Sequence, residues 1–307
     1  LSDGSMEVPS GEKQEILLDA GAILNAYPRF RFAGGKGAKV QITYFEKFGG
    51  PDSDAVRSDL RGEVKGITDT IILDGSELCF EPFWVRSFRF LRLTVEAADS
   101  PVTVIAPVFN KTGYPLPVES HVESSAPWVE KLWDICVRTL QNCMLETYMD
   151  CPYYEQLQYG GDARIQELVS LFNAGDPRLL RNLLDQMDHS RQPEGITQSR
   201  YPSVNPQIIP TYSMAYIWML HDYMMYVDDP DFLRGKLPGA RQVLDYFIRF
   251  TDEGGSLRNL PNWTFVDWSM GFMRGMSPVG SDGGSAVLDL HLLLTYQLAA
   301  EMEETLG

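Results

Sequence analysis

The sequence predicts a chain of two parts, an antiparallel β-sandwich of the jelly-roll kind followed by a domain made of helices. Three observations lead to this fold class. Apolar residues alternate with period two in the first third, their period changes to about 3.6 within residues 114–127, and no strand pattern interrupts the helical segments that follow. We therefore expect a β-sandwich domain at residues 1–120 and a helical domain at residues 121–307.

The strand pattern is clearest in three segments of the first part. In AKVQITYFE (38–46) apolar and polar residues alternate, and PVTVIAPVF (101–109) repeats the alternation. In SFRFLRLTV (87–95) the apolar positions change from even to odd numbers after Phe90. This change indicates either a bulge or a strand that is buried on both faces.

The helical part begins with three segments that carry recognisable start signals. Ser125 and Pro127 suit the start of the first helix, whose apolar stripe runs from Trp128 to Cys143. Asp162 is expected to cap the second helix, because Gly160 and Gly161 just before it discourage helical structure. The third is expected to begin at Asp176 and Pro177 and to bury Leu180, Leu183, Leu184 and Met187.

Three further helices complete the expected set of six. They are expected at residues 211–227, 238–250 and 285–305. Because the connections are alternately short and long and contain no strand, they suggest stacked α-hairpins in a bundle, solenoid or toroid. Cys136 and Cys143, seven residues apart, are expected to be small core residues of the first helix.

Composition excludes two classes of partner. The 307 residues carry 26 basic and 42 acidic side chains, a formal net charge of −16. Nucleic acids and anionic membranes require a basic face, so we expect neither and favour a neutral ligand. No run approaches the roughly 18 apolar residues of a membrane span, so no membrane insertion is expected. We expect any compartment signal to lie outside this sequence, and we favour a periplasmic or extracellular location over a cytoplasmic one.

One stretch concentrates polar chemistry, YMDCPYYEQLQYGGDAR at residues 148–164. Its carboxylates Asp150, Glu155 and Asp162 can converge on one ligand, whereas an ordinary polar connecting loop explains the stretch equally well. Hydrolysis of a glycosidic bond needs a protonated carboxylic acid and a second carboxylate. Glu155 suits the acid, because the two neighbouring negative charges disfavour its ionisation. The tyrosines of the stretch would supply faces and hydroxyls for a sugar ring: Tyr148, Tyr153, Tyr154 and Tyr159.

A second cluster lies in NLPNWTFVDWSMGF (259–272). Trp263, Asp267 and Trp268 combine indole surfaces with a carboxylate, a composition suited to holding a sugar. Core packing explains Phe265 equally well. Asp267 lies between apolar residues, where a bound hydroxyl explains it better than an unpaired buried charge.

Other motif searches point to no cofactor and no metal. The sequence has no GxSxG, HExxH, P-loop or complete GxGxxG motif, and its four histidines and four cysteines are scattered without ligand spacing. Each histidine, His291 included, is expected to be a structural or surface residue. Residues 191–203 form an expected long loop on the same face as the site, with Arg200 and Tyr201 as candidates for substrate contact.

DCPYYEQLQYGGDA (150–163) resembles the signature of the glycoside hydrolase family 78 α-L-rhamnosidases. That signature runs Asp-Cys-Pro, a glutamate five or six residues after the aspartate, a tryptophan or similar aromatic, and Gly-Asp. The segments at 16–46, 80–95 and 262–268 also resemble the family, the first two its β-sandwich and the third its tryptophan and aspartate motif.

The resemblance implies an (α/α)6 toroid that binds a terminal L-rhamnose and cleaves its glycosidic bond with inversion, using a water. Carried over by position, Glu155 would be the general acid, and Asp150 and Asp162 would bind rhamnose hydroxyls. Tyr159 would stand where the family usually has tryptophan. The sugar pocket would be lined by Trp263, Asp267 and Trp268.

Two departures from the family leave alternatives open. Tyr153, Tyr154 and Gln156 replace residues that are usually glutamine or arginine, which allows a glycosidase of the same scaffold acting on another sugar. Six expected helices are half of a twelve-helix toroid, and the family's general base has no counterpart here. We therefore expect a fragment of a longer hydrolase that has little turnover alone, and a non-catalytic carbohydrate-binding protein is the alternative of a different class.

Overall fold

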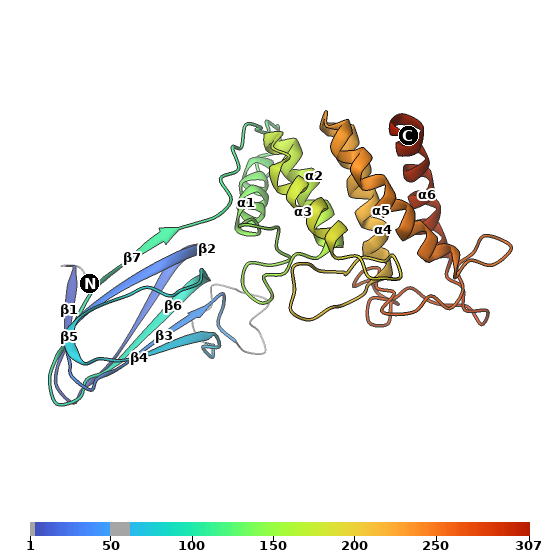
Figure 1. Cartoon of the computed structure of the whole chain (residues 1–307). Helices are drawn as coiled ribbons and strands as arrows, with labels where there is room; N and C mark the ends of the chain where they lie inside the picture. The colour runs from blue at the N-terminus through green and yellow to red at the C-terminus, as the bar shows by residue number, and fades with distance from the viewer. Residues whose placement is uncertain (1–3, 50–61) are drawn as a thin grey trace. The chain divides into compact units, whose positions relative to one another are not determined.

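The computed structural model describes residues 4–49 and 62–307, which fall into two compact units (Figure 1). The first unit contains the strands, reaches to Gly113 and includes Pro152–Tyr154. The second contains the helices and comprises Tyr114–Cys151 and Glu155–Gly307. The expected order of an antiparallel β-structure followed by helices is confirmed.

The strands of the first unit pair in antiparallel fashion in the order β1-β7-β2-β6-β3-β4, and β5 pairs with β2. Each expected strand segment is present, at β3, β6 and β7. The strands in the described residues are β1 (Ser5–Val8), β2 (Lys13–Gly34), β3 (Lys39–Phe45), β4 (Ile67–Ile72), β5 (Gly75–Phe80), β6 (Arg86–Glu96) and β7 (Val102–Lys111).

The long strand β2 serves two sets of neighbours. Its first half pairs with β6 and its second half with β7 and β5. The register of the β2–β6 pair shifts between Asp19 and Leu24, so the bulge lies in β2 and not in β6. The strand β6 itself is buried on both faces: Phe90 packs with Phe45 and Phe48, whereas Leu91 belongs to the larger core. Burial on both faces removes the simple alternation from its sequence.

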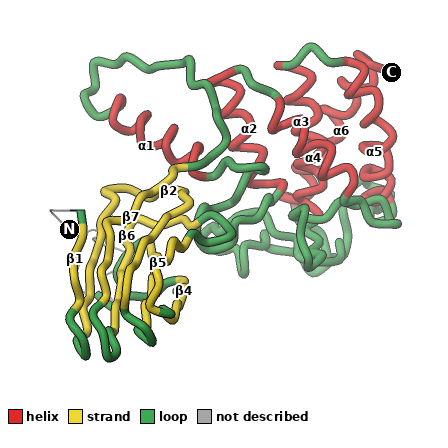
Figure 2. The backbone as a smooth tube through the Cα atoms, turned by 60° about the vertical axis from the view of Figure 1, so that its left-hand side comes forward, coloured by secondary structure: helices red, strands yellow, loops and turns green. Residues whose placement is uncertain are grey.

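The second unit contains six helices, as expected. The three connections at residues 143–159, 190–209 and 249–285 lie at the same end of the helices (Figures 1 and 2), and the other two connections are short. The helices are α1 (Val129–Asn142), α2 (Gly160–Ala174), α3 (Arg178–His189), α4 (Pro210–Tyr226), α5 (Pro230–Ile248) and α6 (Ala286–Leu306).

Two expected helix starts are wrong. Helix α2 begins at Gly160, so Asp162 lies in its first turn and is not its cap. Helix α5 begins eight residues before the expected Pro238, which lies inside it. Asp229 caps α5, accepting a hydrogen bond from the Phe232 amide at 3.4 Å, so the start signal is Asp229 followed by Pro230.

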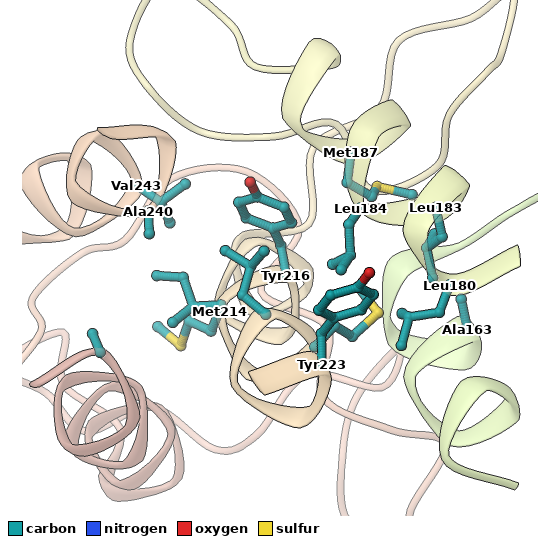
Figure 3. Packing of buried hydrophobic residues seen from close by; sticks show 14 of the residues in the cluster. Ala163, Leu180, Leu183, Leu184, Met187, Met214, Tyr216, Tyr223, Ala240 and Val243 are labelled. Carbon is teal, nitrogen blue, oxygen red and sulfur yellow. The ribbon is translucent and has the colours of Figure 1, made fainter. Parts of the chain in front are cut away.

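The core of the helical unit takes buried residues from all six helices, and Figure 3 shows a part of it around α4. The expected inner face of α3 is confirmed, with all four apolar residues fully buried. They pack together with Tyr216 and Tyr223 of α4, while Ala240 and Val243 come from α5. Each buried leucine of this size contributes about 1.5–3 kcal/mol through removal of apolar surface from water.

The apolar stripe of α1 is largely exposed. Trp128 is 62 % exposed, and Leu132 and Ile135 are each 48 % exposed. Of the two expected core cysteines, Cys143 is buried and Cys136 is exposed, so the prediction for Cys136 is wrong. Within the described residues, α1 is buried only near its C-terminal end, at Leu140 and Asn142. None of the helices in the described ranges is long and apolar enough to cross a membrane.

Candidate active site

The helical unit contains a cleft of about 480 Å³, lined by residues of the long connections and of α2, α4 and α6. Seven of the site residues expected from the sequence line this cleft: Asp150, Glu155, Tyr159, Asp162, Trp263, Asp267 and Trp268. They come from two connections and the first turn of α2. Segments about a hundred residues apart in the sequence therefore meet at one site.

Hydrogen bonds within the connection between α1 and α2 hold its two ends together. The Asp150 amide donates to the Leu157 carbonyl at 2.9 Å, and the Leu157 amide donates to Oδ1 of Asp150 at 2.9 Å. The buried Gln158 side chain accepts a hydrogen bond from the Tyr148 amide and donates to the Tyr201 carbonyl. These contacts fix the backbone on both sides of Glu155, whose own side chain is exposed.

Asp162 is positioned by a close approach between α2 and α4. A Cβ atom on Gly161 would lie 2.3 Å from the ring of Tyr212, so only glycine permits this contact. The Tyr212 hydroxyl donates to Oδ2 of Asp162 at 3.3 Å. Burial, together with the charges of Asp150 and Glu155, raises the pKa of the Asp162 carboxyl, although the hydrogen bond from Tyr212 opposes the shift.

Tyr159 connects Glu155 to the connection between α3 and α4. Its hydroxyl donates to Oε2 of Glu155 at 2.8 Å and accepts from Nη1 of Arg200 at 2.8 Å. Burial and the bond to Glu155 raise the pKa of Tyr159 to about 12. The expected contribution of residues 191–203 therefore reaches the site through Arg200, whereas Tyr201 packs against the helical core.

The connection between α5 and α6 supplies the aromatic wall of the cleft. Phe265 packs at 5.0 Å from Trp263 and 5.3 Å from Trp268, measured between ring centroids. The Trp263 indole is held by a 3.1 Å hydrogen bond from Nε1 to the Arg274 carbonyl. Asp267 is exposed and accepts from the Trp268 amide at 2.7 Å, so it is not an unpaired buried charge, the alternative that the sequence disfavoured. Neighbours in the sequence do not report which loop side chains face solvent.

The structure adds lining residues that the sequence analysis missed. Arg164 of α2 pairs with Asp222 of α4 at 2.9 Å and lies over the Trp218 ring at 5.1 Å. His291 of α6 lies beside the same indole, with ring centroids 5.4 Å apart, and lines the cleft rather than the outer surface. Helices α4 and α6 are apolar on most sides, so no periodic pattern in their sequences marks these positions.

Of the four tyrosines expected to face a sugar, only Tyr159 lines the cleft. Tyr148 is fully buried, and its hydroxyl shares a hydrogen bond with Ser170 at 2.7 Å. Tyr153 belongs to the strand unit, where its hydroxyl donates to the Tyr44 carbonyl at 2.9 Å. Tyr154 packs against Tyr153. The expectation is therefore wrong for these three, because adjacent residues of a loop point in different directions.

The chemistry of the cleft is that of carboxylates beside aromatic surfaces. Four carboxylates line it, and indole and phenol rings form its walls. Such a set can hold hydroxyl groups, stack on a sugar ring and deliver a proton. No group of three or more metal-ligating side chains suited to an ion is found within residues 4–49 and 62–307.

Two protein-family models match the chain. Residues 10–109 match the bacterial alpha-L-rhamnosidase concanavalin-like domain. Residues 117–307 match the bacterial alpha-L-rhamnosidase 6 hairpin glycosidase domain. No curated protein sequence matches the chain.

Solved rhamnosidase structures share the fold. A family 78 rhamnosidase of Bacillus sp. GL1 is 21 % identical with a TM-score of 0.84, and 99 % of this chain aligns with 30 % of that one. A Klebsiella oxytoca rhamnosidase with rhamnose bound is 21 % identical with a TM-score of 0.77, covering 98 % and 59 %. A Streptomyces avermitilis alpha-L-rhamnosidase complexed with L-rhamnose is 20 % identical with a TM-score of 0.69, covering 98 % and 29 %. The chain thus spans 29 to 59 % of the length of these proteins.

Proposed function

This chain belongs to the bacterial α-L-rhamnosidase family, and on that premise we propose that its cleft binds a terminal α-L-rhamnose and takes part in inverting hydrolysis of the glycosidic bond. The observation that carries the proposal is the gathering of Asp150, Glu155, Asp162 and Asp267 with three tryptophans in one cleft. Bound rhamnose in two structures of the same fold supports the choice of sugar.

Glu155 is the proton donor in this proposal. Its carboxyl gives a proton to the leaving oxygen while the bond between that oxygen and the anomeric carbon breaks and a water attacks from the opposite face. Its exposed position in the cleft supports the role, because a donor must reach an oxygen shared with the next sugar or aglycone. An inverting reaction also needs a carboxylate that takes a proton from the water, and we assign that role to no residue of this chain.

The remaining carboxylates hold the sugar. Asp150 and Asp162 lie deeper than Glu155, each half-buried, and accept hydrogen bonds from rhamnose hydroxyls. Asp267, in the connection between α5 and α6, accepts a further hydrogen bond from a rhamnose hydroxyl. Tyr159, Trp263 and Trp268 present ring faces to the sugar, whose C–H surfaces pack on aromatic planes.

The test is hydrolysis of an aryl α-L-rhamnoside by the full-length protein and its Glu155→Gln variant. We expect the variant to lose about 10²–10⁴-fold in kcat on a poorly activated rhamnoside, the usual contribution of general acid catalysis. A matched control is Glu253→Gln, an exposed glutamate outside the cleft, which leaves kcat unchanged.

Other outcomes separate the competing functions. Release of a different sugar but not of rhamnose would identify a glycosidase of another specificity on this scaffold. Rhamnose binding without release of any sugar would identify a carbohydrate-binding protein. Undiminished release from a poorly activated rhamnoside by Glu155→Gln would remove Glu155 as the acid.

A further inference from the structure

Three side chains form a directed hydrogen-bonded chain that ends at the proposed proton donor. Nη1 of Arg200 donates to the Tyr159 hydroxyl, and that hydroxyl donates to Oε2 of Glu155, each at 2.8 Å. We propose that Arg200 and Tyr159 are positioning residues that fix Oε2 of Glu155, so that Oε1 carries the proton to the leaving oxygen. This proposal rests on the function proposed above for Glu155.

The direction of the chain follows from the donors available. A guanidinium has N–H donors and no acceptor, so the tyrosine hydroxyl must accept from Arg200 with its oxygen. Its own hydrogen is then directed elsewhere, and the carboxylate oxygen of Glu155 is the acceptor it meets. The raised pKa of Tyr159, about 12, keeps this hydrogen in place at neutral pH. Arg200 therefore sets the orientation of a bond that it does not itself make.

A phenol can take the middle position, whereas an indole or a phenyl ring cannot. An indole, which the family motif usually has here, donates through its N–H but accepts no hydrogen bond, and a phenylalanine does neither. The tyrosine thus links the carboxylate to a cation that an indole could not engage in the same way. The Arg200 guanidinium also lies over the Tyr159 ring, 5.5 Å from its centroid, which restricts both side chains.

The backbone near both residues is held independently of these side chains. The Gly160 amide donates to the Ser199 carbonyl at 2.9 Å, and the Tyr201 amide donates to the Gln158 carbonyl at 3.2 Å. Because these bonds flank Arg200 and Tyr159, shortening either side chain leaves the two connections paired. The effect of a substitution on Glu155 can therefore be separated from unfolding of the loops.

The charges around Glu155 explain why positioning is needed. Asp150 and Asp162 repel an ionised Glu155, and Asp267 adds a fourth carboxylate to the cleft. Arg164 and His291 line the same cleft, and Arg164 is paired with Asp222. Without the bond from Tyr159, an exposed glutamate would turn away from the other carboxylates towards water. The chain from Arg200 opposes that movement.

The kinetic test compares two leaving groups in the full-length protein. A methyl α-L-rhamnoside needs protonation of its leaving oxygen, and a 2,4-dinitrophenyl α-L-rhamnoside does not. We expect Tyr159→Phe and Arg200→Gln to lower kcat on the methyl glycoside about 10- to 100-fold, a part of the usual contribution of a general acid. The expected loss on the dinitrophenyl glycoside is less than about 3-fold, since proton donation contributes little to that reaction. Arg200→Lys, which keeps a cationic donor, is expected to recover part of the loss. Equal losses on both glycosides would show a merely structural role and overturn the proposal.

The matched control is Tyr114→Phe. The Tyr114 hydroxyl also donates to a carboxylate, Oδ2 of Asp176 at 2.7 Å, but neither residue lines the cleft. We expect this variant to treat both glycosides as the wild type does.

Crystal structures give a readout that does not depend on activity. In Tyr159→Phe we expect the Glu155 carboxyl to leave its wild-type position, whereas in Tyr114→Phe it stays. An unmoved Glu155 in Tyr159→Phe overturns the positioning proposal even if the protein hydrolyses rhamnosides. If the wild type has no hydrolytic activity but Glu155 still moves in Tyr159→Phe, the proposed function is overturned and the positioning contact stands.

Discussion

Burial keeps one carboxyl group of this protein, that of Glu167, in its neutral form. Glu167 of α2 is fully buried, and neither of its carboxyl oxygens has a hydrogen-bond partner in the described structure. Burial, followed by the charge of Asp222, raises the pKa of Glu167 to about 9, although Arg164 opposes the shift. Glu167 is therefore neutral at physiological pH and lies behind the pair of Arg164 and Asp222 at the cleft wall.

This burial predicts a pH-dependent gain in stability for Glu167→Gln. Below about pH 4.5 the glutamate is protonated in both the folded and unfolded chains, so wild type and variant differ little. As the pH rises from about 4.5 to about 9, the unfolded chain ionises and the folded one resists, so the wild type loses stability relative to the variant. We expect a difference on the order of a few kcal/mol at pH 8.

Denaturant unfolding at pH 5 and pH 8 measures this difference in the free energy of unfolding. Exposed Glu253→Gln is the control and should show no dependence on pH relative to the wild type. A Glu167→Gln variant that is less stable than the wild type at pH 8 would contradict the neutral state of Glu167.

At the scale of elements, the start of α2 shows a local rule overridden by packing. Adjacent glycines predict a helix start after them, yet Gly160 and Gly161 are its first residues. The tight contact of Gly161 with Tyr212 of α4, described above, explains why glycine is needed there. Helix propensity is worth only about 1 kcal/mol for a glycine, so a close contact between helices outweighs it.

Gly161→Ala is expected to destabilise the protein although alanine favours helices. The added Cβ would lie 2.3 Å from the Tyr212 ring, and displacing that ring costs about 1–3 kcal/mol. The displaced ring also withdraws the hydroxyl from Asp162, so we expect weaker rhamnose binding. Thermal unfolding and calorimetric titration with rhamnose check the two effects.

Gly235→Ala in α5 is the matched control, because nothing lies within 4 Å of the Cβ it would gain. We expect it to stabilise the protein by about 0.5–1 kcal/mol. If Gly161→Ala stabilised the protein to the same extent, the contact with Tyr212 would not be restrictive.

At the scale of the whole molecule, several apolar residues on the helices are exposed in the described part of the chain. Trp128, just before α1, and Leu132 and Ile135 within it form one exposed stripe, and in α6 Leu290 and Leu293 are more than half exposed. Contiguous apolar surface of this kind drives association in water. The net charge of −16 opposes association through repulsion.

We expect the 307 residues, produced alone, to self-associate more strongly as salt is added. Salt screens the repulsion between the charges and leaves the apolar attraction in place. Light scattering coupled to size-exclusion chromatography, at low and high salt, measures this. Leu132→Glu and Ile135→Lys together should reduce the associated fraction, and a chain that remains monomeric in all conditions would contradict the prediction.

Much of the fold followed from local patterns in the sequence. Period-two alternation located β3 and β7, and apolar stripes of period 3.6 with start signals located α1, α2 and α3. Burial of one face imposes such a period, as in α3. The apolar pattern is less informative in β6, where both faces are buried. The expected start of α5 is wrong because Pro238, expected at the helix start, lies inside the helix.

The sequence by itself determined which residue types could form the site, since carboxylates and aromatics in two loops suit a sugar whatever the fold. Only the tertiary structure decided which of them meet. It brought Asp267 and Trp268 to the same cleft as Glu155, turned Tyr148 and Tyr153 away from it, and placed Arg200 behind Tyr159. The physical reason is that loop direction and long-range contacts depend on packing between helices, which no local periodicity records.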